Sequence, residues 1–486
     1  MDPKEIIDRL RQITTEEAAL IRRAFAFATA AHKGQKRLSG EPYLIHPFHT
    51  ALYLAEIQAD SQTVAAGLLH DTIEDTTTTA EQLEREFGAE IAFLVEGVTK
   101  LGRLKYRGGV RHAESLRKLF LAMAEDIRVI MIRLADRLHN VRTLQHLPPE
   151  KQKRIALETL EIYAPLANRL GIWRLKGMLE DASFPYVYPN EYKQVVALRK
   201  TKGKETIKRL EKIYRALEQA LATRQIKNYQ IDYRVKYLYS LYVKLLRKEM
   251  NIDDIYDISA LRVVVETTDE CYQVLGIIHG LWRPIPGRLK DYIAIPKPNG
   301  YQSIHTSIFT GDGCAVEIQI RTARMQHEAE FGIASHFVYD ETAKGRPDRN
   351  QTTNRSNWIK ELVDWQKNFK TDEKFVGRLT DRLTQEKIFV FTPKGEVVEL
   401  PIDASPLDFA YAIHSDIGDR AAGAKINQKM SSLGAKLRDD DVVEIIVNKN
   451  NHPTAKWLEL TKTATAKHHI RNFLAKQQEK IKEKNS

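Results

Sequence analysis

The 486-residue sequence has only two cysteines, Cys271 and Cys314. Two cysteines provide neither a disulfide framework nor a cysteine-rich zinc site. The sequence also lacks any apolar run near the roughly 20 residues that a membrane-spanning helix needs. Its first residues, Met-Asp-Pro-Lys-Glu, contain no apolar signal core. We therefore expect a protein of the reducing cytoplasm, without disulfides or a membrane span.

Hydrophobic residues make up 43% of the chain and charged residues 29%, which is typical of globular domains with apolar cores. At roughly 100–200 residues per domain, the length predicts about three domains. The formal net charge is +11. This excess fits two interpretations equally: a surface for phosphate-rich partners such as nucleotides, tRNA or the ribosome, or a solvated basic face without a partner.

Hydrophobic periodicity changes type along the chain. Apolar residues recur at helical spacing up to about residue 190, where Pro185 and Pro189 are expected to bracket a closing turn. Short strand-like runs then alternate with helices. The strands expected are 261–265, 292–295, 304–309, 315–320, 387–391 and 441–447, and the helices 127–138, 155–170, 271–282 and 410–414. The segments expected are a helical domain (1–190), a helical connector (191–227), an α/β domain (228–340), a linker and helix (341–387), a small β domain (388–450) and a basic C-terminal segment (451–486).

Two histidines and two aspartates of the first domain form a candidate metal site. His46 precedes an apolar helical stretch, His70 and Asp71 close another, and Asp136 lies in a third. Two imidazoles and two carboxylates form a mixed nitrogen and oxygen set that suits Mn, Fe or Zn. A single His-Asp dipeptide is more often structural, so the pair alone does not decide.

Two further acids follow this dipeptide. Glu74 lies four residues after His70, and Asp75 lies four residues after Asp71. On a continuous helix both acids would share the face of the proposed ligands. A carboxylate beside a metal and its water can take a proton from that water.

The spacing of His46, His70-Asp71 and Asp136 resembles the HD phosphohydrolase superfamily, in which these residues bind the metal. The segments 37–43, 70–76 and 136–144 look like the hydrolase domain of RelA/SpoT-type alarmone enzymes. The resemblance implies that Glu74 and Asp75 activate water. The residues that it places near the bound nucleotide are Arg37, Ser39, Asn140 and Thr143.

Two details of the hydrolase segments bear on activity. Synthetase-only relatives lose the His-Asp pair, which this chain keeps, so we expect active hydrolysis. In contrast, Leu38 stands where the family usually has a basic residue. One expected phosphate contact is therefore weakened.

Basic residues gather in the second domain. Arg234 and Lys236 are expected to alternate on one strand face, and Lys244 follows on a helix. Such cations could cradle a triphosphate and neutralise charge during phosphoryl transfer. An ordinary basic surface explains them equally well. The further cations around the Pro/Gly loop are Arg283, Arg288, Lys290 and Lys297.

Acids amid this positive charge indicate Mg²⁺ ligation. Asp257 precedes one expected strand, and Glu317 lies on another. One of them could also deprotonate an attacking hydroxyl. The alternative for either acid is a salt bridge to a neighbouring arginine, such as Arg262 or Arg321.

The run Gly-Tyr-Gln-Ser-Ile-His-Thr at 300–306 is the sharpest local signal of this domain. The face of Tyr301 could stack on a purine, and Gln302 and His305 offer hydrogen bonds. A buried core tyrosine is the alternative. This run and the segments 287–294, 317–322 and 329–334 are similar to the synthetase domain of the same family.

This second resemblance implies pyrophosphate transfer from ATP to the 3′-hydroxyl of GDP or GTP, with AMP leaving. Asp257 and Glu317 would hold Mg²⁺, and Glu317 would activate the hydroxyl. Tyr301 would stack on guanine and His305 would contact phosphates. The nucleotide-binding set that it implies is Arg234, Lys236, Ser240, Lys244, Arg288, Lys290, Lys297, Tyr301, Gln302 and His305. One departure is Tyr233, where the family usually has glycine.

Residues 388–450 carry no paired acid, base and nucleophile. They resemble the TGS domain, a β-grasp module that reads the end of deacylated tRNA in long alarmone enzymes. His414 matches the histidine at that contact, although a β-grasp histidine is in general more often structural, so the two roles stay equally open. Long members continue into zinc-finger-like and ACT regions, which this sequence does not show.

We therefore expect a multidomain protein: an all-α HD-type hydrolase domain, an α/β nucleotidyltransferase-like synthetase domain and a small β-grasp TGS domain. The expected function is synthesis and hydrolysis of (p)ppGpp, with Mn²⁺ in the hydrolase site and Mg²⁺ in the synthetase site. Expected partners are ATP, GDP or GTP, (p)ppGpp, and deacylated tRNA or the ribosome. Reciprocal control is expected through the connector at about 180–225. The alternatives are a hydrolase with a weak synthetase, or a tRNA- or ribosome-binding regulator with vestigial catalytic domains.

Overall fold

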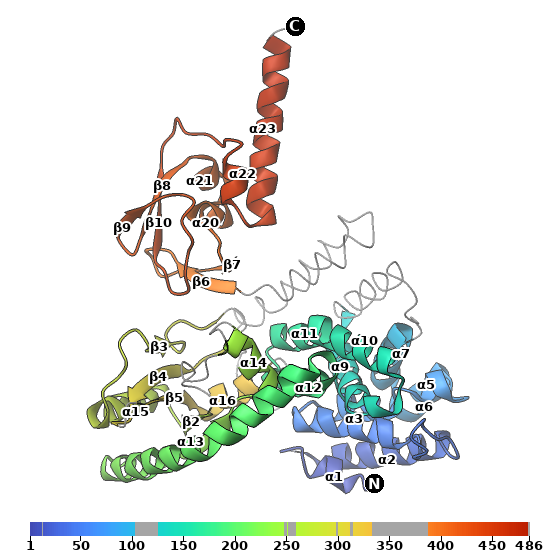
Figure 1. Ribbon diagram of the computed structural model, residues 1–486. Coiled ribbons are helices and arrows are strands. Elements are labelled where there is room, and N and C mark those ends of the chain that lie inside the picture. Colours follow the sequence, from blue (N-terminus) through green and yellow to red (C-terminus); the bar gives the residue numbers. More distant parts are fainter. Residues whose placement is uncertain are drawn as a thin grey trace. The chain divides into compact units, whose positions relative to one another are not determined.

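The computed structural model describes residues 1–11, 13–102, 125–246, 250, 259–297, 300–311, 314–332 and 387–484. Contacts divide the chain into two compact units, Met1–Leu383 and Thr384–Ser486, and Figure 1 labels their elements. Within the described ranges, no helix is long and apolar enough to cross a membrane. The expected linker at 341–387 lies outside them, apart from its last residue.

The first unit begins with a helical region, as the periodicity predicts. Side-chain caps fix several helix starts: Thr14 and Glu17 form a capping box, and Asp60 and Asp126 each accept a hydrogen bond from a first-turn amide. The helices are α1 (Lys4–Ile7), α2 (Thr15–Ala31), α3 (Ile45–Glu56), α4 (Ser61–Leu69), α5 (Thr72–Asp75), α6 (Ala80–Phe87), α7 (Ala89–Gly102), α9 (Ile127–Arg142), a 3₁₀ turn (Leu144–His146), α10 (Pro149–Glu158), a π turn (Thr159–Tyr163), α11 (Ala164–Arg169) and α12 (Trp173–Val187).

Helices α3, α4 and α9 contact one another at the centre of this region. Gly67 of α4 faces α3, where a side chain would overlap Leu54 and meet Ala51. Since both neighbours are fully buried, the missing side chain lets the two helices approach closely. This approach brings His46 at the start of α3 beside His70 at the end of α4.

The turn after α12 differs from the prediction. Pro185 lies inside α12, which ends at Val187. Only Tyr188 separates it from the next helix, α13 (Pro189–Thr223). The prediction that a proline stands on each side of the closing turn is therefore wrong for Pro185. The fully buried ring of Phe184 packs against aromatic rings of neighbouring helices, and this packing outweighs the backbone hydrogen bond that a proline removes. The long connector helix itself is confirmed.

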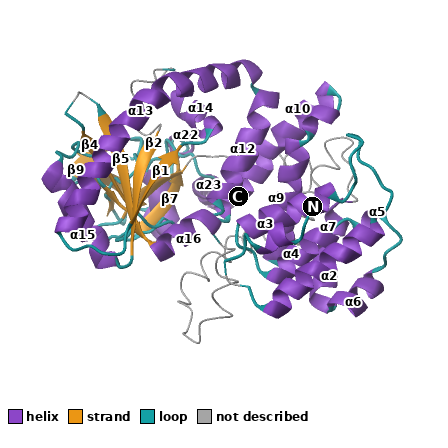
Figure 2. Cartoon of the chain, turned by 90° about the horizontal axis from the view of Figure 1, so that it is seen from below, coloured by secondary structure: helices purple, strands orange, loops and turns teal. Residues whose placement is uncertain are grey.

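The α/β region of the first unit contains a five-stranded sheet of order β1-β2-β5-β4-β3. Strands β2 and β5 run parallel, and the other neighbours run antiparallel. In Figure 2 these strands gather beside α13 and α15. The elements are β1 (Gln230–Val235), α14 (Leu238–Leu246), β2 (Ser259–Val265), α15 (Thr268–Leu281), β3 (Lys290–Asp291), β4 (Ile304–Phe309), β5 (Ala315–Thr322) and α16 (Ala323–Phe331).

Alternation along β5 separates a core face from a polar face. Ile318 and Ile320 are fully buried in the cluster that α13 and α15 cover, so Glu317, Gln319 and Arg321 point to the opposite face. The hairpin of β4 and β5 is confirmed in its described strands. It pairs His305 with Gln319, which places both residues on that polar face.

The expected strand at 292–295 is wrong. Strand β3 ends at Asp291, and the next residues form a turn. The carboxylate of Asp291 accepts hydrogen bonds from the amides of Ile293 and Ala294, at 2.9 and 3.0 Å. Such a local Asx turn competes with the strand ladder and ends it.

The second unit is a small β-rich module followed by helices. A hairpin (β6-β7) and a three-stranded sheet (β10-β8-β9) are linked by a bridge between Phe391 and Val442. The buried carboxylate of Asp408 accepts hydrogen bonds from the amides of Lys462 and Thr463, which ties the helical end to the module. The elements are β6 (Lys387–Phe391), β7 (Val397–Pro401), α20 (Pro406–Ile413), α21 (Ser415–Asp419), β8 (Ala421–Ile426), β9 (Lys429–Ser431), β10 (Val443–Val447), α22 (Trp457–Leu460) and α23 (Ala464–Lys484).

Candidate active sites

The predicted metal set comes together in the helical region. Ligand atoms of His46, His70 and Asp136 lie within 4.8 Å of one another, and all three residues are buried. Asp71 joins them: its two carboxylate oxygens lie 3.4 Å from His46 Nε2 and 3.2 Å from His70 Nε2. Helices α3, α4 and α9 and the link between α4 and α5 thus converge on one point.

Hydrogen bonds at the outer ring nitrogens orient both imidazoles. His70 Nδ1 lies 2.7 Å from the carbonyl oxygen of Gly67, so this nitrogen carries the proton and Nε2 keeps its lone pair. His70 Nε2 and His46 Nε2 face each other at 3.2 Å. Two lone pairs so close repel each other, whereas a cation between them and the aspartates would be bound. The donor set therefore fits a divalent metal ion.

His139 on α9 supports the other imidazole and was not predicted. Its Nδ1 lies 2.9 Å from His46 Nδ1 and 2.9 Å from Arg37 Nη1. Burial is the main cause that lowers the pKa of His139 to about 2, and the charge of Arg37 lowers it further. The neutral ring therefore accepts hydrogen bonds at Nδ1, including one from His46 Nδ1–H. This bond leaves the lone pair of His46 Nε2 directed at the metal site.

Arg133 and Asn140 hold the carboxylate of Asp136. Arg133 Nη1 lies 2.7 Å from one oxygen, and Asn140 Nδ2 donates to the other. Burial alone would raise the pKa of Asp136, but the charge of Arg133 counteracts burial, and that pKa is held well below its usual range. Asp136 is therefore an anionic ligand at neutral pH.

The two predicted catalytic acids lie beside this cluster. The hydroxyl of Tyr43 contacts the carboxylates of both Asp71 and Asp75, so Asp75 shares the face of Asp71 as predicted, despite the break between α4 and α5. Burial, followed by the charges of Asp71 and Asp75, raises the pKa of Glu74. A raised pKa makes Glu74 a better proton acceptor near neutral pH.

A cavity of about 530 Å³ opens beside Asp136. The predicted nucleotide-binding residues all line it, namely Arg37, Ser39, Asn140 and Thr143. Leu38 also lines it and is 84% exposed. Sequence reasoning missed several cations of its wall, which are Lys36, Arg133, Arg137 and Arg154. The cavity therefore combines a metal-fitting cluster with a basic wall, as a phosphate ester requires.

The second site centres on Glu317, on the polar face of the five-stranded sheet. Its Oε1 lies 3.3 Å from His305 Nδ1 and accepts a hydrogen bond of 2.8 Å from Gln319 Nε2. His305 Nε2 lies 2.8 Å from the hydroxyl of Tyr301. Arg321 Nη2 donates both to that hydroxyl, at 2.9 Å, and to Gln319 Oε1, at 2.7 Å. These five side chains close a hydrogen-bonded ring, which we call the Glu317 ring.

Donors and acceptors in the Glu317 ring all run in one direction, from Arg321 to Glu317. Burial alone would raise the pKa of Glu317, but hydrogen bonds from His305 and Gln319 and nearby positive charge hold it well below its usual range. Burial is also the main cause that lowers the pKa of His305. A neutral His305 and an ionised Glu317 follow, which is the state that a metal-binding carboxylate needs.

The other predicted synthetase residues differ in whether the structure bears out their expected positions. Arg234 lies close enough to act on the pKa of His305, and Lys244 on that of Glu317. Lys236 was expected on β1, but the strand ends at Val235. Lys236 instead lies in the short connection between β1 and α14, which begins at Leu238. Asp257 lies outside the described residues.

The loop around Tyr301 gathers rings and cations. Tyr301 meets the rings of Tyr292 and Trp173 edge to face, and Lys297 lies over Tyr292 at 4.5 Å. Gln302 Nε2 donates to the carbonyl of Ile293, at 3.3 Å. The other cations predicted here are Arg288, which is exposed, and Lys290, which lies in β3 opposite His305.

Tyr233 and His414, the last two residues singled out from the sequence, have clear local contacts. Tyr233 stacks on Tyr214 of α13 with ring centroids 5.9 Å apart. In the second unit, His414 ends α20 and caps α21, accepting a hydrogen bond from the amide of Asp416 at 3.2 Å. Its side chain remains 62% exposed, so the capping role leaves a face open to solvent.

Three protein families match this chain. An HD domain matches residues 24–173, the region found in RelA / SpoT proteins matches 233–344, and a TGS domain matches 388–447. A solved structure, small alarmone synthetase 2 from Bacillus subtilis, is 25% identical and covers 40% of this chain at a TM-score of 0.24, which is too low to support a conclusion.

Several curated relatives align with nearly the whole chain. It is 46% identical over 98% of its length to the guanosine-3′,5′-bis(diphosphate) 3′-pyrophosphohydrolase of Aquifex aeolicus, covering 67% of that protein. It is 45% identical to a probable enzyme of the same name from Synechocystis and 44% identical to the bifunctional (p)ppGpp synthase/hydrolase SpoT of Escherichia coli. These matches cover 96% and 97% of this chain but only 62% and 65% of those two proteins. The chain belongs to the RelA/SpoT family.

Proposed function

We propose that this chain is a bifunctional enzyme that makes (p)ppGpp from ATP and GDP or GTP and hydrolyses it back. The observation that carries this proposal is the presence of two separate side-chain constellations in one unit. One is the cluster of His46, His70, Asp71 and Asp136 beside a basic cavity. The other is the Glu317 ring on the polar face of the sheet. The family membership supports both activities.

In the hydrolase site, the four clustered ligands would hold a divalent cation, for which we propose Mn²⁺. Such an ion supplies positive charge that polarises a phosphate and eases deprotonation of water. Glu74, with its raised pKa, would accept the proton of the attacking water. Arg37 and Asn140, which line the cavity, would hold the nucleotide so that its 3′-pyrophosphate lies against the cluster.

In the synthetase site, the 3′-hydroxyl of GDP or GTP would attack the β-phosphate of ATP. The bond between the α- and β-phosphates breaks, AMP leaves, and the hydroxyl proton goes to a nearby base. Arg234 and Lys244 would neutralise phosphate charge, and Tyr301 would stack on guanine. The low pKa of Glu317 supports a role in holding Mg²⁺ more than a role as that base, since a weak base accepts protons poorly.

For the second unit we propose a contact with deacylated tRNA through its TGS domain. The observation that favours this contact is His414, whose imidazole is more than half exposed at the junction of two helices. Loss of tRNA binding in a His414→Ala variant with an intact fold would support it. Equal binding by that variant and the wild type would refute it.

Nucleotide turnover by the whole chain tests the central proposal. With ATP, GDP and Mg²⁺, we expect AMP and a new guanine nucleotide in equal amounts. With that product and Mn²⁺, we expect GDP and intact pyrophosphate. No AMP and no new nucleotide would defeat the synthetase proposal, and no pyrophosphate would defeat the hydrolase proposal. If saturating ATP and GDP left hydrolysis unchanged, reciprocal control of the two sites would be absent.

A further inference from the structure

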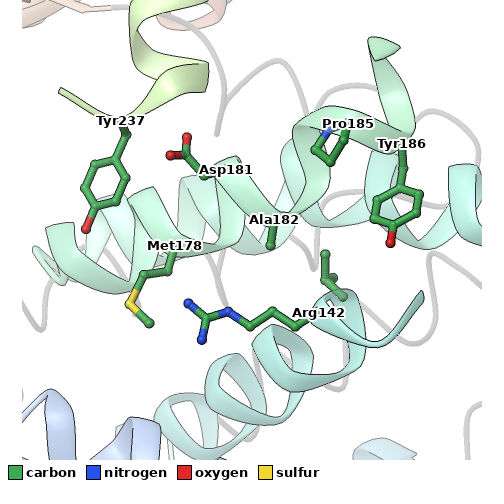
Figure 3. Close-up of a pocket in the computed structure, with 8 residues that line it drawn as sticks. Arg142, Met178, Asp181, Ala182, Pro185, Tyr186 and Tyr237 are labelled. Carbon is green, nitrogen blue, oxygen red and sulfur yellow. The ribbon is translucent and has the colours of Figure 1, made fainter. Parts of the chain in front are cut away.

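The last helix of the hydrolase region, α12, touches the synthetase helix α14 at its first turn. Helix α14 carries Ser240 and Lys244, two residues of the proposed ATP site. Figure 3 shows Asp181 of α12 with its carboxylate directed toward the segment that carries Tyr237 and begins α14. This contact joins the two catalytic regions at a helix N-terminus.

Asp181 caps α14 from outside that helix. Its Oδ1 accepts a hydrogen bond from the amide of Tyr239 at 2.9 Å, and its Oδ2 accepts one from the amide of Leu238 at 3.1 Å. Both amides belong to the first turn, whose N–H groups have no partner within the helix. A carboxylate there satisfies these donors and interacts favourably with the helix dipole.

The residue that would normally cap this helix cannot do so. Tyr237 precedes Leu238, and its side chain has no oxygen near the backbone amides of the first turn. Its ring instead lies on Gly177 of α12, where any side chain would overlap it. The start of α14 therefore depends on α12 for both its cap and its packing.

A second polar contact holds one of the proposed ATP-site residues. Ser240 Oγ donates to Glu180 Oε2 of α12 at 3.2 Å, and Lys176 lies 3.2 Å from the other carboxylate oxygen. At the start of α12, Trp173 contacts the ring of Tyr301. One helix of the hydrolase region thus contacts residues on both sides of the synthetase site.

We propose that Asp181 is a positioning residue of the synthetase site, which holds the first turn of α14 so that Ser240 and Lys244 are presented to ATP. This inference rests on the proposed synthetase function. It assigns the hydrolase region a direct part in ATP binding, through the hydrogen-bonded cap that Asp181 of α12 provides to α14. Asp181 touches neither substrate nor metal in this scheme.

The site is suitable for substitution. Asp181 lines a cavity of about 410 Å³ with Arg142, Met178 and Tyr186. Removing its carboxylate enlarges an existing space instead of opening a new void in a close-packed core. The fold is therefore expected to survive Asp181→Ala. Asparagine also caps helices well, so Asp181→Asn is the conservative variant.

Three variants of the whole chain test the proposal, each assayed for synthesis and for hydrolysis. We expect Asp181→Ala to raise the KM for ATP about tenfold, the change that corresponds to about 1.4 kcal/mol, with a smaller change in kcat and hydrolysis within about twofold. Asp181→Asn should restore most of the ATP affinity. Asp269→Ala is the matched control, because Asp269 is an exposed acid in the first turn of α15, and it should behave as wild type.

Hydrogen exchange provides a readout that is independent of turnover. The amides of Leu238 and Tyr239 should exchange faster in Asp181→Ala than in wild type, and near the wild-type rate in Asp181→Asn. An unchanged KM for ATP in Asp181→Ala, or equal loss of both activities, would overturn the proposal. A wild-type chain without synthesis would instead defeat the proposed function, while the exchange rates would still decide whether Asp181 holds α14.

Discussion

The two candidate sites satisfy their buried polar groups in opposite ways. In the hydrolase site, His46 and His70 direct nitrogen lone pairs at each other at 3.2 Å, with Asp136 beside them. In the synthetase site, Glu317 accepts hydrogen bonds from within its own ring of side chains. In the first arrangement a cation would bind the facing lone pairs, whereas in the second Oε1 of Glu317 already has two hydrogen-bond donors.

This difference predicts how each site meets its ligand. The hydrolase cluster can take up a divalent cation with its ligands already in place, because helix packing and the bonds from Gly67 and His139 orient both imidazoles. At Glu317, a metal ion bound to Oε1 would compete with the two hydrogen-bond donors that already contact this oxygen. The hydrolase cluster is thus preorganised for a cation, whereas Glu317 Oε1 is engaged by the Glu317 ring.

The largest effect is expected from Asp136→Asn. The substitution keeps the shape of the side chain but removes a buried anionic ligand, so hydrolysis should fall more than the roughly 100-fold seen when mere supporting residues of metal sites are lost. Synthesis should stay within about twofold. Initial rates of both reactions check this, and equal loss of both activities would mean that the two sites are not independent.

Arg321→Met should be the next largest. Arg321 is buried, and its Nη2 donates to Tyr301 and Gln319. Its loss therefore removes the donor from which both branches of the Glu317 ring begin. Charged hydrogen bonds of this kind contribute about 1.5–3 kcal/mol, and synthesis should fall roughly 10–100-fold while hydrolysis is kept.

The control for Arg321 is Arg324→Met. Arg324 is exposed on α16 and lies 4.0 Å from Glu328, so its loss should change neither activity. If both methionine variants kept full synthesis, the Glu317 ring would have no role in the reaction.

His139→Ala should weaken metal binding without removing a ligand. Without the acceptor at Nδ1, His46 loses the bond that fixes its tautomer, and the apparent affinity for Mn²⁺ should fall about 10-fold or more. A Mn²⁺ titration of hydrolysis checks this. If the hydrolysis rate of His139→Ala recovered at saturating Mn²⁺, the defect would lie in metal binding. That result would support a hydrolase site whose ligands are oriented before the metal binds.

Leu38→Lys should produce a small gain. Leu38 is 84% exposed on the wall of the hydrolase cavity, where a lysine would meet phosphate at the solvent edge. Exposed charge pairs contribute about 0.2–1 kcal/mol, so the KM for (p)ppGpp should fall no more than about fivefold. The gain should shrink at high salt, and a gain that is independent of salt would argue against a phosphate contact.

The smallest effect concerns stability and pH. Because the pKa of Glu74 is raised in the folded chain, the folded state binds this proton more tightly than the unfolded state, and stability is lost as pH rises through that pKa. Glu74→Gln should therefore raise the Tm at pH 7.5 by up to about 2 °C in metal-free protein. The difference should vanish below the ordinary glutamate pKa, and a larger rise at low pH would contradict the sign of the shift.

Sequence reasoning found the residues whose chemistry is unusual for their place in the chain. His46, His70, Asp71 and Asp136 were predicted correctly to come together, because their spacing resembles that of the HD phosphohydrolase superfamily. Leu38 and Tyr233 were visible as departures from the family. The α/β order also followed from periodicity, since branched strands alternate with capped helices.

Residues whose role depends on contacts between distant helices were missed. His139 lies on the same helix as Asp136, yet only the packing of α3 against α9 brings it to His46. Arg133 was missed although its contact with Asp136 is local, since the two residues lie three positions apart on α9. Asp181 had no signal at all, because the amides that it caps lie 57 and 58 residues away along the chain. The false strand at 292–295 had a local signal, an aspartate positioned to form an Asx turn.

The central claim is that two separate sites run opposed reactions in one chain. Comparing Asp71→Ala with Glu317→Gln tests it most directly, with synthesis measured in Mg²⁺ and hydrolysis in Mn²⁺. Asp71→Ala should abolish hydrolysis and keep synthesis, and Glu317→Gln should abolish synthesis and keep hydrolysis. If either substitution removed both activities, or if neither removed the activity assigned to it, the two-site account would be contradicted.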